Sequence, residues 1–297
     1  MQRLLIIGCG DVVRRALPWL TRRYRVYATV RRTEDAPALR ALGVTPLLAD
    51  LDRPESLRRL AGIGELLLHS APPTDRGEED NRTRRLLAAL ETRGSLPRRG
   101  VYISTTGIYG DCAGAEADET RTPAPKSARG RRRLHAESLL RAWGARRGVG
   151  IALLRAPGIY AADRLPTARI GRGDPVLRPL DDVHTNHIHA EDLAKIASLA
   201  LSRGRPNRAL NAVDDTRLTM GDWFDKVADT LGLPRPPRVS REDAMRILSP
   251  MTLSFMGESR VLANRRLKRE LRYRFLYPDV DAGLAAAKIC RGELVRP

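Results

Sequence analysis

The sequence predicts an α/β protein with a doubly wound parallel sheet and a smaller C-terminal region. Short apolar runs alternate with segments of helical spacing through the first half of the chain, which is typical of strand–helix–strand units. The first apolar run, Arg3–Ile7, passes directly into a glycine-rich turn and then into a helical pattern. Short links between these segments complete the pattern of a doubly wound sheet.

Six apolar runs in the first half have the length and composition of buried parallel strands. We expect these strands at Arg3–Ile7, Arg25–Val30, Val44–Ala49, Glu65–His69, Gly100–Ser104 and Ile151–Arg155. Between them lie segments whose apolar residues recur near helical spacing, as at Val13, Leu17 and Leu20. We expect these helices at Asp11–Arg22, Pro37–Leu42, Pro54–Leu60, Glu79–Thr92 and Arg131–Gly144.

The pattern changes after Arg155. Segment 156–182 is rich in Pro, Gly and Arg and is expected to form loops. Farther on we expect a helix at Ala190–Ser202, a strand at Ala209–Val213, a helix at Met220–Leu231 and a mostly helical segment from Pro234 onward. We therefore assign residues 1–155 and roughly 183–215 to a dinucleotide-type domain, and residues 156–182 and 216–297 to a substrate-side region.

The chain has 297 residues, 53 Lys plus Arg against 35 Asp plus Glu, and a formal charge of +18. Such a balance occurs in nucleic-acid-binding proteins. However, only five of the 53 cations are Lys, the Arg residues are spread over the chain, and aromatic residues make up 4%. We interpret the charge as Arg-rich composition and expect no dedicated nucleic-acid binding.

Membrane and redox signals point to a cytoplasmic protein. No apolar run approaches the roughly 18 residues that cross a bilayer, so we expect no membrane partner. Three widely separated cysteines without a secretory signal fit a reducing compartment. No metal site is expected, because His184, His187 and His189 have no Cys or carboxylate partners at ligand spacing.

The turn after the first strand, Gly8-Cys9-Gly10-Asp11-Val12-Val13, has the pattern of a dinucleotide-binding loop. Gly8 would allow the tight turn, and Gly10 would let the backbone approach a pyrophosphate at the helix N-terminus. Val13 replaces the usual third glycine, so the helix must pack differently on the strand. Asp11 places a carboxylate beside the expected phosphate site. A glycine-rich turn without ligand is the alternative interpretation.

The residues after the second strand favour NADP over NAD. An NAD enzyme places an acid there for the ribose hydroxyls, whereas a 2′-phosphate is held by Arg. This sequence has Arg31 and Arg32 at that point, and two surface arginines are the alternative. A guanidinium can hold a phosphate through paired hydrogen bonds. The remaining predicted cofactor contacts are Asp50 and Leu51 after the third strand, Ser70 and Ala71 after the fourth, and Pro157 after the sixth.

Three further segments resemble the extended short-chain dehydrogenases/reductases. Ser104–Gly110 (STTGIYG) resembles their S-S/T-x-x-V-Y-G segment, and Leu154–Tyr160 resembles their LR-x-x-x-x-YG segment. Asn186–Ala194 (NHIHAEDLA) resembles their N-x-IH-x-x-DLA segment. The resemblance covers most of the chain in the right order. It implies a Rossmann domain, a nicotinamide dinucleotide, often a nucleotide-sugar substrate, and a two-fold dimer formed through helices beside the sheet.

The chain departs from that family at its catalytic pair. The family's Tyr-x-x-x-Lys positions hold Arg129 and Arg133, while Thr105 matches the family's hydroxyl position. A guanidinium stays protonated, so Arg129 cannot replace the phenol as an acid, although Arg133 could still hydrogen-bond the ribose. The chain therefore resembles the atypical, nucleoside-diphosphate-sugar epimerase-like members. Tyr109 is the nearest other phenol by motif, with Tyr160 and His69 as further candidates, and packing roles are the alternative for all three.

Three functional hypotheses follow for this chain. The first is an NADP-dependent oxidoreductase or epimerase-like enzyme with a nonstandard acid, acting on a phosphorylated or nucleotide-linked, anionic small molecule. The second is a catalytically silent dinucleotide sensor, and the third a scaffold that has lost tight cofactor binding. The basic run Lys126–Arg133 is either an anion-binding rim or a solvated helix start. The arginines that flank the substrate loop are Arg155, Arg164, Arg169 and Arg172, and Arg260 and Asn264–Arg266 are candidates to close the pocket.

Overall fold

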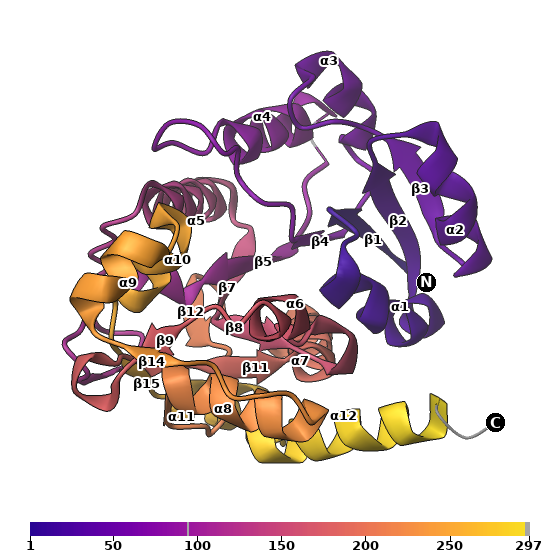
Figure 1. Cartoon of the computed structure of the whole chain (residues 1–297). Coiled ribbons are helices and arrows are strands. Elements are labelled where there is room, and N and C mark those ends of the chain that lie inside the picture. The colour runs from indigo at the N-terminus through magenta and orange to yellow at the C-terminus, as the bar shows by residue number, and fades with distance from the viewer. Residues whose placement is uncertain (94, 295–297) are drawn as a thin grey trace.

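The computed structural model describes residues 1–93 and 95–294, and its centre is a parallel sheet (Figure 1). The strands are β1 (Gln2–Ile7), β2 (Tyr24–Val30), β3 (Thr45–Leu48), β4 (Leu66–His69), β5 (Arg99–Thr105), β7 (Gly150–Ala156) and β12 (Arg208–Asn211). They are ordered β12-β7-β5-β4-β1-β2-β3, and every neighbouring pair is parallel. The predicted doubly wound sheet is confirmed, and its strand order reverses between β1 and β4.

Helices cover both faces of the sheet because the strands are apolar on both faces. Leu4 and Ile6 pack with residues of α1 (Asp11–Arg23), α2 (Ala36–Ala41), α7 (Ala190–Arg203) and α11 (Arg265–Leu271). Leu5 and Ile7 point to the opposite face, as alternation along a strand requires, and pack with α3 (Pro54–Leu57), α4 (Asn81–Leu90) and α5 (Ala128–Arg147). Val13 lies in the first of these cores at 1% exposure, so its side chain fills the space that the missing glycine would leave.

Helix α5 is longer than the predicted helix at Arg131–Gly144. It starts at Ala128 because the Ser127 hydroxyl accepts a hydrogen bond from the Gly130 backbone N–H, an N-cap interaction. It ends at Gly148, whose φ of +68° is the left-handed conformation common after a helix. The basic run Lys126–Arg133 is therefore the start of this helix, and apolar spacing could not show it there.

The segment 156–182, predicted as loops, contains short regular elements. These are β8 (Gly158–Tyr160), α6 (Thr167–Gly171) and β9 (Val176–Leu177). β8 pairs with β11 (His187–His189), and β9 pairs with β14 (Arg238–Val239). The other short strands are β6 (Glu116–Ala117), β10 (His184–Thr185), β13 (Leu218–Thr219) and β15 (Val261–Leu262). Strands of two or three residues leave no periodic signal in a sequence, which is why the prediction missed them.

The C-terminal part is mostly helical, as predicted, and packs back on the sheet domain. Besides α11, its helices are α8 (Met220–Leu231), α9 (Arg241–Ile247), α10 (Pro250–Met256) and α12 (Val280–Leu294), which lie along the left and lower sides of Figure 1. The buried carboxylate of Asp192 in α7 accepts hydrogen bonds from the Tyr273 hydroxyl (2.5 Å) and from the N–H groups of Leu276 (2.8 Å) and Tyr277 (3.0 Å). Asp192, which lies in the first turn of α7, therefore holds the C-terminal segment against that helix.

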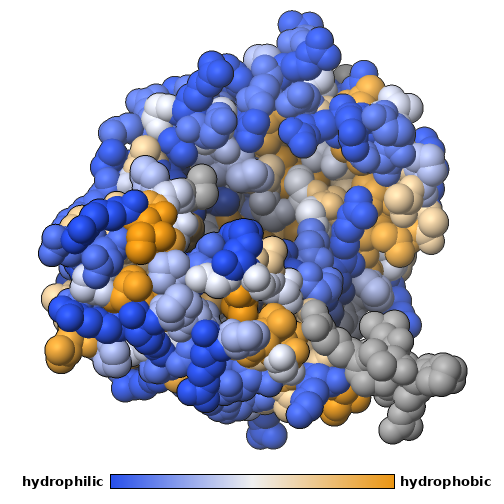
Figure 2. All heavy atoms as spheres, in the orientation of Figure 1, coloured by the Kyte–Doolittle hydropathy of each residue, from blue (hydrophilic) through white to orange (hydrophobic). Residues whose placement is uncertain are grey.

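The surface is strongly hydrophilic. The face in Figure 2 is mostly blue, and its hydrophobic residues form small separated groups. Many of the arginines lie in ion pairs with Asp or Glu, such as Arg147 with Glu91 (2.8 Å) and Arg235 with Asp229 (2.8 Å). Among the described residues, no helix is both long and apolar enough to cross a membrane.

Buried Asp214 should make stability pH-dependent. Burial raises the pKa of Asp214 to about 8, and its Oδ2 atom has no hydrogen-bond partner among the described residues. Since the ordinary pKa of Asp is near 4, the folded chain binds an extra proton between about pH 4 and pH 8. This stabilisation is complete below pH 4 and is lost as the pH rises to 8.

We expect Asp214→Asn, which is neutral at every pH, to remove this dependence. Between pH 5 and pH 8 the free energy of unfolding of the parent should fall relative to that of the variant, by up to about 1 kcal/mol per pH unit. Urea denaturation at pH 5, 6, 7 and 8 measures the difference. The same dependence of the free energy of unfolding on pH in the parent and the variant would contradict this prediction.

Candidate functional site

The glycine-rich turn lies at the carboxyl end of β1, next to the end of β4, where the strand order reverses. Ligands of doubly wound sheets bind at such a point. Gly8 has a φ of +84°, and a Cβ there would lie 2.6 Å from the Ala71 backbone N, so only glycine fits. The Ser70 hydroxyl donates to the Gly8 carbonyl, and the Gly8 N–H donates to Thr29 Oγ1 (3.1 Å). Ser70 and Ala71, two predicted cofactor residues, thus shape the turn itself.

One hollow of about 370 Å³ opens beside this turn, between the ends of β1, β2 and β4. It is lined by most of the predicted cofactor residues, namely Gly8, Gly10, Arg31, Asp50, Leu51, Ser70 and Ala71. Arg14 of α1 also lines it. Arg32 does not line it, and its exposed guanidinium pairs with Asp35 (3.1 Å), which is itself a lining residue. Of the two predicted phosphate-binding arginines, the structure brings only Arg31 to the hollow.

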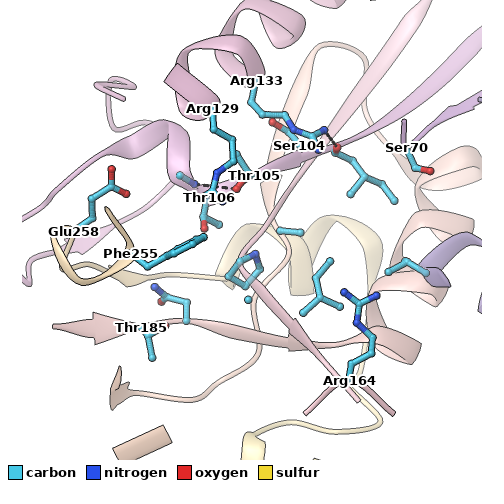
Figure 3. A pocket seen from close by; sticks show the side chains of 18 of the residues that line it. Ser70, Ser104, Thr105, Thr106, Arg129, Arg133, Arg164, Thr185, Phe255 and Glu258 are labelled. Atoms are coloured by element: carbon cyan, nitrogen blue, oxygen red, sulfur yellow. Dashed lines mark hydrogen bonds between the residues drawn. The ribbon is translucent and has the colours of Figure 1, made fainter. Parts of the chain in front are cut away.

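A second hollow, of about 490 Å³, adjoins the first at Gly10 and Ser70, which line both. The predicted residues in its wall are Asp11, Val12, Val13, Thr105, Arg129, Arg133 and Pro157. The start of α1, the end of β5 and the first turns of α5 therefore meet around one space. Figure 3 shows Thr105, Arg129 and Arg133 on one side of it and Arg164 on the other.

The two arginines at the Tyr and Lys positions have different partners. Arg133 Nη1 donates to the Tyr102 hydroxyl (2.9 Å) and to the Ile103 carbonyl (3.0 Å), so one end of its guanidinium is fixed to β5. Arg129 lies with its guanidinium 4.3 Å from the centre of the Phe255 ring of α10. Burial lowers the pKa of Arg129 from its ordinary value. Arg129 therefore presents a partly desolvated cation to the cavity, where an anion would be attracted strongly.

Two hydroxyl groups at the end of β5 lie in the same wall. The Thr105 oxygen accepts a hydrogen bond from the Gly107 N–H (3.2 Å), which leaves its own proton available for a ligand. Ser104, which the sequence prediction did not select, also lines the hollow, and its buried hydroxyl has no partner among the described residues. Both hydroxyls can therefore donate to a substrate oxygen.

Tyr109 is placed away from the cavity, which corrects its prediction as a catalytic residue. It is 1% exposed, donates to Asn211 Oδ1 (2.8 Å) and accepts from Arg155 Nη1 (2.7 Å). Burial raises its pKa to about 12, despite the opposing effect of Arg155. A phenol that binds its proton so tightly and lies in the core does not exchange it with a ligand.

The other two alternative acids are also structural. Burial lowers the pKa of His69 to about 4, and its Nε2 atom lies 3.0 Å from Thr83 Oγ1. The Tyr160 hydroxyl donates to the Asp279 carbonyl (3.0 Å). His189 caps α7 by accepting a hydrogen bond from the Glu191 N–H (3.2 Å). No cluster of three metal-ligating side chains occurs within residues 1–93 and 95–294.

Several wall residues of the second hollow come from the C-terminal half of the chain, where little in the sequence indicates which residues belong to a site. They are His184, Asn186, Phe255, Glu258 and Arg260. Arg260, which the sequence suggested as a residue that closes the pocket, does line the second hollow. It forms an ion pair with Glu258 (2.7 Å). Asn264 instead donates to the carbonyls of Val213 and Asp214 and lines neither hollow. A single histidine in a two-residue strand, or a glutamate in a loop, has no sequence signature of a site.

Comparison with known proteins agrees with this geometry. Residues 16–212 match the model of the NAD dependent epimerase/dehydratase family. The chain belongs to this family. A functionally unknown conserved protein from Silicibacter pomeroyi DSS has 30% sequence identity and a TM-score of 0.81, covering 98% of this chain and 99% of its own. A putative NAD-dependent epimerase/dehydratase from Methylobacillus flagellatus has 26% identity and a TM-score of 0.74, over 98% of this chain and 99% of its own.

More distant epimerases share the fold. The UDP-glucose 4-epimerase of Thermotoga maritima has a TM-score of 0.79 at 16% identity, and covers 99% of this chain and 100% of its own. No curated protein matches the chain in sequence. Membership in the epimerase/dehydratase family supports an oxidoreductase-like function with a nicotinamide dinucleotide. Arg129 and Arg133, which the sequence resemblance places at the family's Tyr and Lys positions, both line the second hollow.

Proposed function

We propose that this chain binds NADP(H) and acts as an oxidoreductase or epimerase-like enzyme on a small anionic substrate, with a nonstandard acid. The observation that carries the proposal is that the two hollows adjoin at Gly10 and Ser70. One end is suited to an adenosine phosphate, and the other is walled by hydroxyl groups and arginines. The carboxyl ends of β1, β4 and β5 supply the floor between them. This arrangement fits a dinucleotide laid across the switch point.

Two arginines support NADP over NAD. Arg14 and Arg31 both line the adenosine end, where a 2′-phosphate would lie. Asp35 lines the same hollow, but Arg32 holds its carboxylate through two hydrogen bonds (3.1 and 3.2 Å). The acid that could otherwise receive the ribose hydroxyls of NAD is thus already occupied. The positive charges of Arg14 and Arg31 at this end of the first hollow favour binding of a 2′-phosphate.

We expect Arg31→Ala to weaken NADPH binding by about tenfold to a hundredfold, the worth of a charge-assisted hydrogen bond. NADH has no 2′-phosphate, so its affinity should change little and the gap between the two cofactors should narrow. Fluorescence titration of NADPH and NADH measures both. Arg40→Ala, an exposed arginine of α2 that lines neither hollow, is the matched control. Equal affinity of the parent for the two cofactors would refute the assignment to NADP.

The substrate end fits an anion that carries a carbonyl or hydroxyl group. When bound, the nicotinamide ring would supply or accept the hydride. The Thr105 hydroxyl would donate to the substrate oxygen, and the Arg129 cation would stabilise negative charge that develops there. The space beside Arg129 and Arg260 would hold the anionic group of the substrate.

The proton must come from a group other than the family's phenol. Among the described wall residues no tyrosine occurs, Glu258 is paired with Arg260, and Asp11 is paired with Arg15 and Arg164. We assign the role to His184, an exposed wall residue whose imidazole can donate a ring N–H proton. In a reduction, the carbonyl carbon would gain the hydride and the oxygen would take a proton from His184, whose imidazole would regain a proton from solvent water.

A catalytically silent dinucleotide sensor is the second candidate. The observation that favours it is the fixed position of Arg133, whose guanidinium donates to β5. In the family pattern a lysine at this position would hold the cofactor ribose and assist the phenol. If Arg129 and Arg133 replace the family's Tyr and Lys and no other side chain acts as the acid, the chain would bind the cofactor without turnover.

A turnover assay separates the two candidates. We expect the parent to oxidise NADPH with carbonyl compounds that carry a phosphate or carboxylate, and His184→Asn to lower kcat at least about a hundredfold, as loss of a general acid does. Absence of parental turnover, together with activity in the Arg129→Tyr/Arg133→Lys double variant, would instead establish the silent sensor. Retained binding of NADPH by each variant is the required control.

A further inference from the structure

Four arginines flank the substrate loop that follows β7, and the structure distinguishes one of them. Arg155 is buried in a two-bond pair with Glu137 (2.9 and 3.2 Å). Arg169 lies 4.3 Å from the centre of the Phe224 ring, and Arg172 pairs with Asp174 (2.6 Å) on the surface. Arg164 alone of the four lines the second hollow, toward which Figure 3 shows it pointing.

The partner of Arg164 is the phosphate loop. Its Nη1 atom lies 2.8 Å from Oδ2 of Asp11, the residue that follows Gly10 and begins α1. This ion pair joins positions 153 residues apart and connects the short helical turn Ala162–Arg164 to the expected phosphate site. Both side chains keep more than a third of their surface exposed, so the contact can open without unpacking a core.

Asp11 has a second partner that does not depend on Arg164. Arg15, one turn later on α1, contacts both Asp11 oxygens through Nε (3.2 Å each), and is itself held by Asp163 (2.5 Å) and Glu191 (3.3 Å). Although partial burial opposes the effect, hydrogen bonds from Arg15 and Arg164 lower the pKa of Asp11. Asp11 is therefore an anion, and Arg15 can continue to balance its charge when Arg164 leaves.

A pyrophosphate at this helix start would place two negative charges beside the Asp11 carboxylate. Backbone N–H groups and the helix dipole attract such a ligand, whereas Asp11 repels it. A guanidinium between the pyrophosphate and the Asp11 carboxylate offsets this repulsion. It forms paired hydrogen bonds to phosphate, and these are stronger than the hydrogen bonds of neutral donors. A bound phosphate and the Asp11 carboxylate would therefore compete for Arg164.

We propose that Arg164 is a clamp for the dinucleotide pyrophosphate, held in reserve by Asp11 until the cofactor binds. On binding, the Arg164 side chain exchanges the carboxylate for the pyrophosphate, while Arg15 retains Asp11 and, through its ion pair with Asp163 (2.5 Å), keeps the loop after β8 against α1. The proposal rests on dinucleotide binding at this loop. It makes Arg164 a cofactor-positioning residue and Asp11 a residue that weakens binding.

The first test is the affinity of Arg164→Gln for three ligands. NADPH and NADH share the pyrophosphate, so both should bind about tenfold to a hundredfold more weakly. Adenosine 2′-monophosphate has no phosphate on its 5′ oxygen, so nothing in it reaches Arg164, and its affinity should stay the same. Arg172→Gln, which removes the same charge eight residues away outside the cavity, should change none of the three. Unchanged NADPH affinity in Arg164→Gln would overturn the clamp.

The second test uses the opposite member of the pair. Asp11→Asn frees Arg164 and removes the repelling charge, so we expect NADPH to bind several-fold more tightly than to the parent. If the ion pair served only to hold the loop in place, both variants would break the same contact and both would weaken binding. Changes of the same sign would therefore overturn the proposal. A parent that binds neither NADPH nor NADH would refute dinucleotide binding itself, whereas normal binding with an inert Arg164 refutes the clamp alone.

Discussion

Replacing Glu137 with leucine is expected to lower the free energy of unfolding by about 3–5 kcal/mol. Glu137 on α5 and Arg155 on β7 are both almost fully buried and form two hydrogen bonds (2.9 and 3.2 Å). Leucine has a similar size but leaves the guanidinium without its counter-charge in the core, where an unpaired charge is costly. Urea denaturation with tryptophan fluorescence measures the loss.

The double variant Glu137→Leu/Arg155→Met is the matched control for this pair. Removing both charges together replaces a buried ion pair by apolar side chains, which is often nearly neutral. We expect it to recover most of the stability that the single variant loses, apart from the hydrogen bond of Arg155 to Tyr109. A double variant as unstable as the single one would show that the site depends on packing rather than on charge.

Replacing Gly10 with valine is expected to abolish measurable NADPH binding, a loss of at least about a hundredfold, and to leave stability nearly unchanged. Gly10 has a φ of −79°, and a Cβ there would meet no atom within 4 Å, so the free protein accepts a side chain. The same open space is the junction of the two hollows. A valine would occupy the position where the pyrophosphate approaches the backbone.

Titration with NADPH and a thermal unfolding curve give the two readings. Gly171→Val is the matched control, because a Cβ at Gly171 also meets no atom within 4 Å but lies outside both hollows. It should bind NADPH like the parent. If Gly10→Val bound NADPH like the parent, the cofactor would have to bind away from Gly10, which would contradict this prediction.

The sheet was predictable because its signals are local. Leu4 to Ile7 and Leu66 to Leu68 are apolar on both faces, as strands covered by helices must be. The position of Arg31 at the end of β2 also predicted that it lies beside the glycine-rich turn, where it lines the first hollow. The start of α5 was not predictable in this way, since its first turns carry arginines in place of an apolar stripe, and the Ser127 cap decides where it begins.

The substrate side was less predictable because its contacts join distant parts of the chain. Arg164 and Asp11 are 153 residues apart, and Arg129 meets Phe255 of α10. Motif position suggested Tyr109 as a replacement acid, but Arg155 and Asn211 hold its hydroxyl in the core. Motifs locate a residue on a strand or loop, whereas the direction of its side chain depends on tertiary packing.

The most direct test of the account is a crystal structure of the chain with NADP+. We predict that the adenosine 2′-phosphate contacts Arg31, that the pyrophosphate lies against Gly10 within reach of Arg164, and that the nicotinamide C4 faces Thr105 in the second hollow. A cofactor bound outside the two hollows, or a 2′-phosphate directed into solvent away from Arg14 and Arg31, would contradict it.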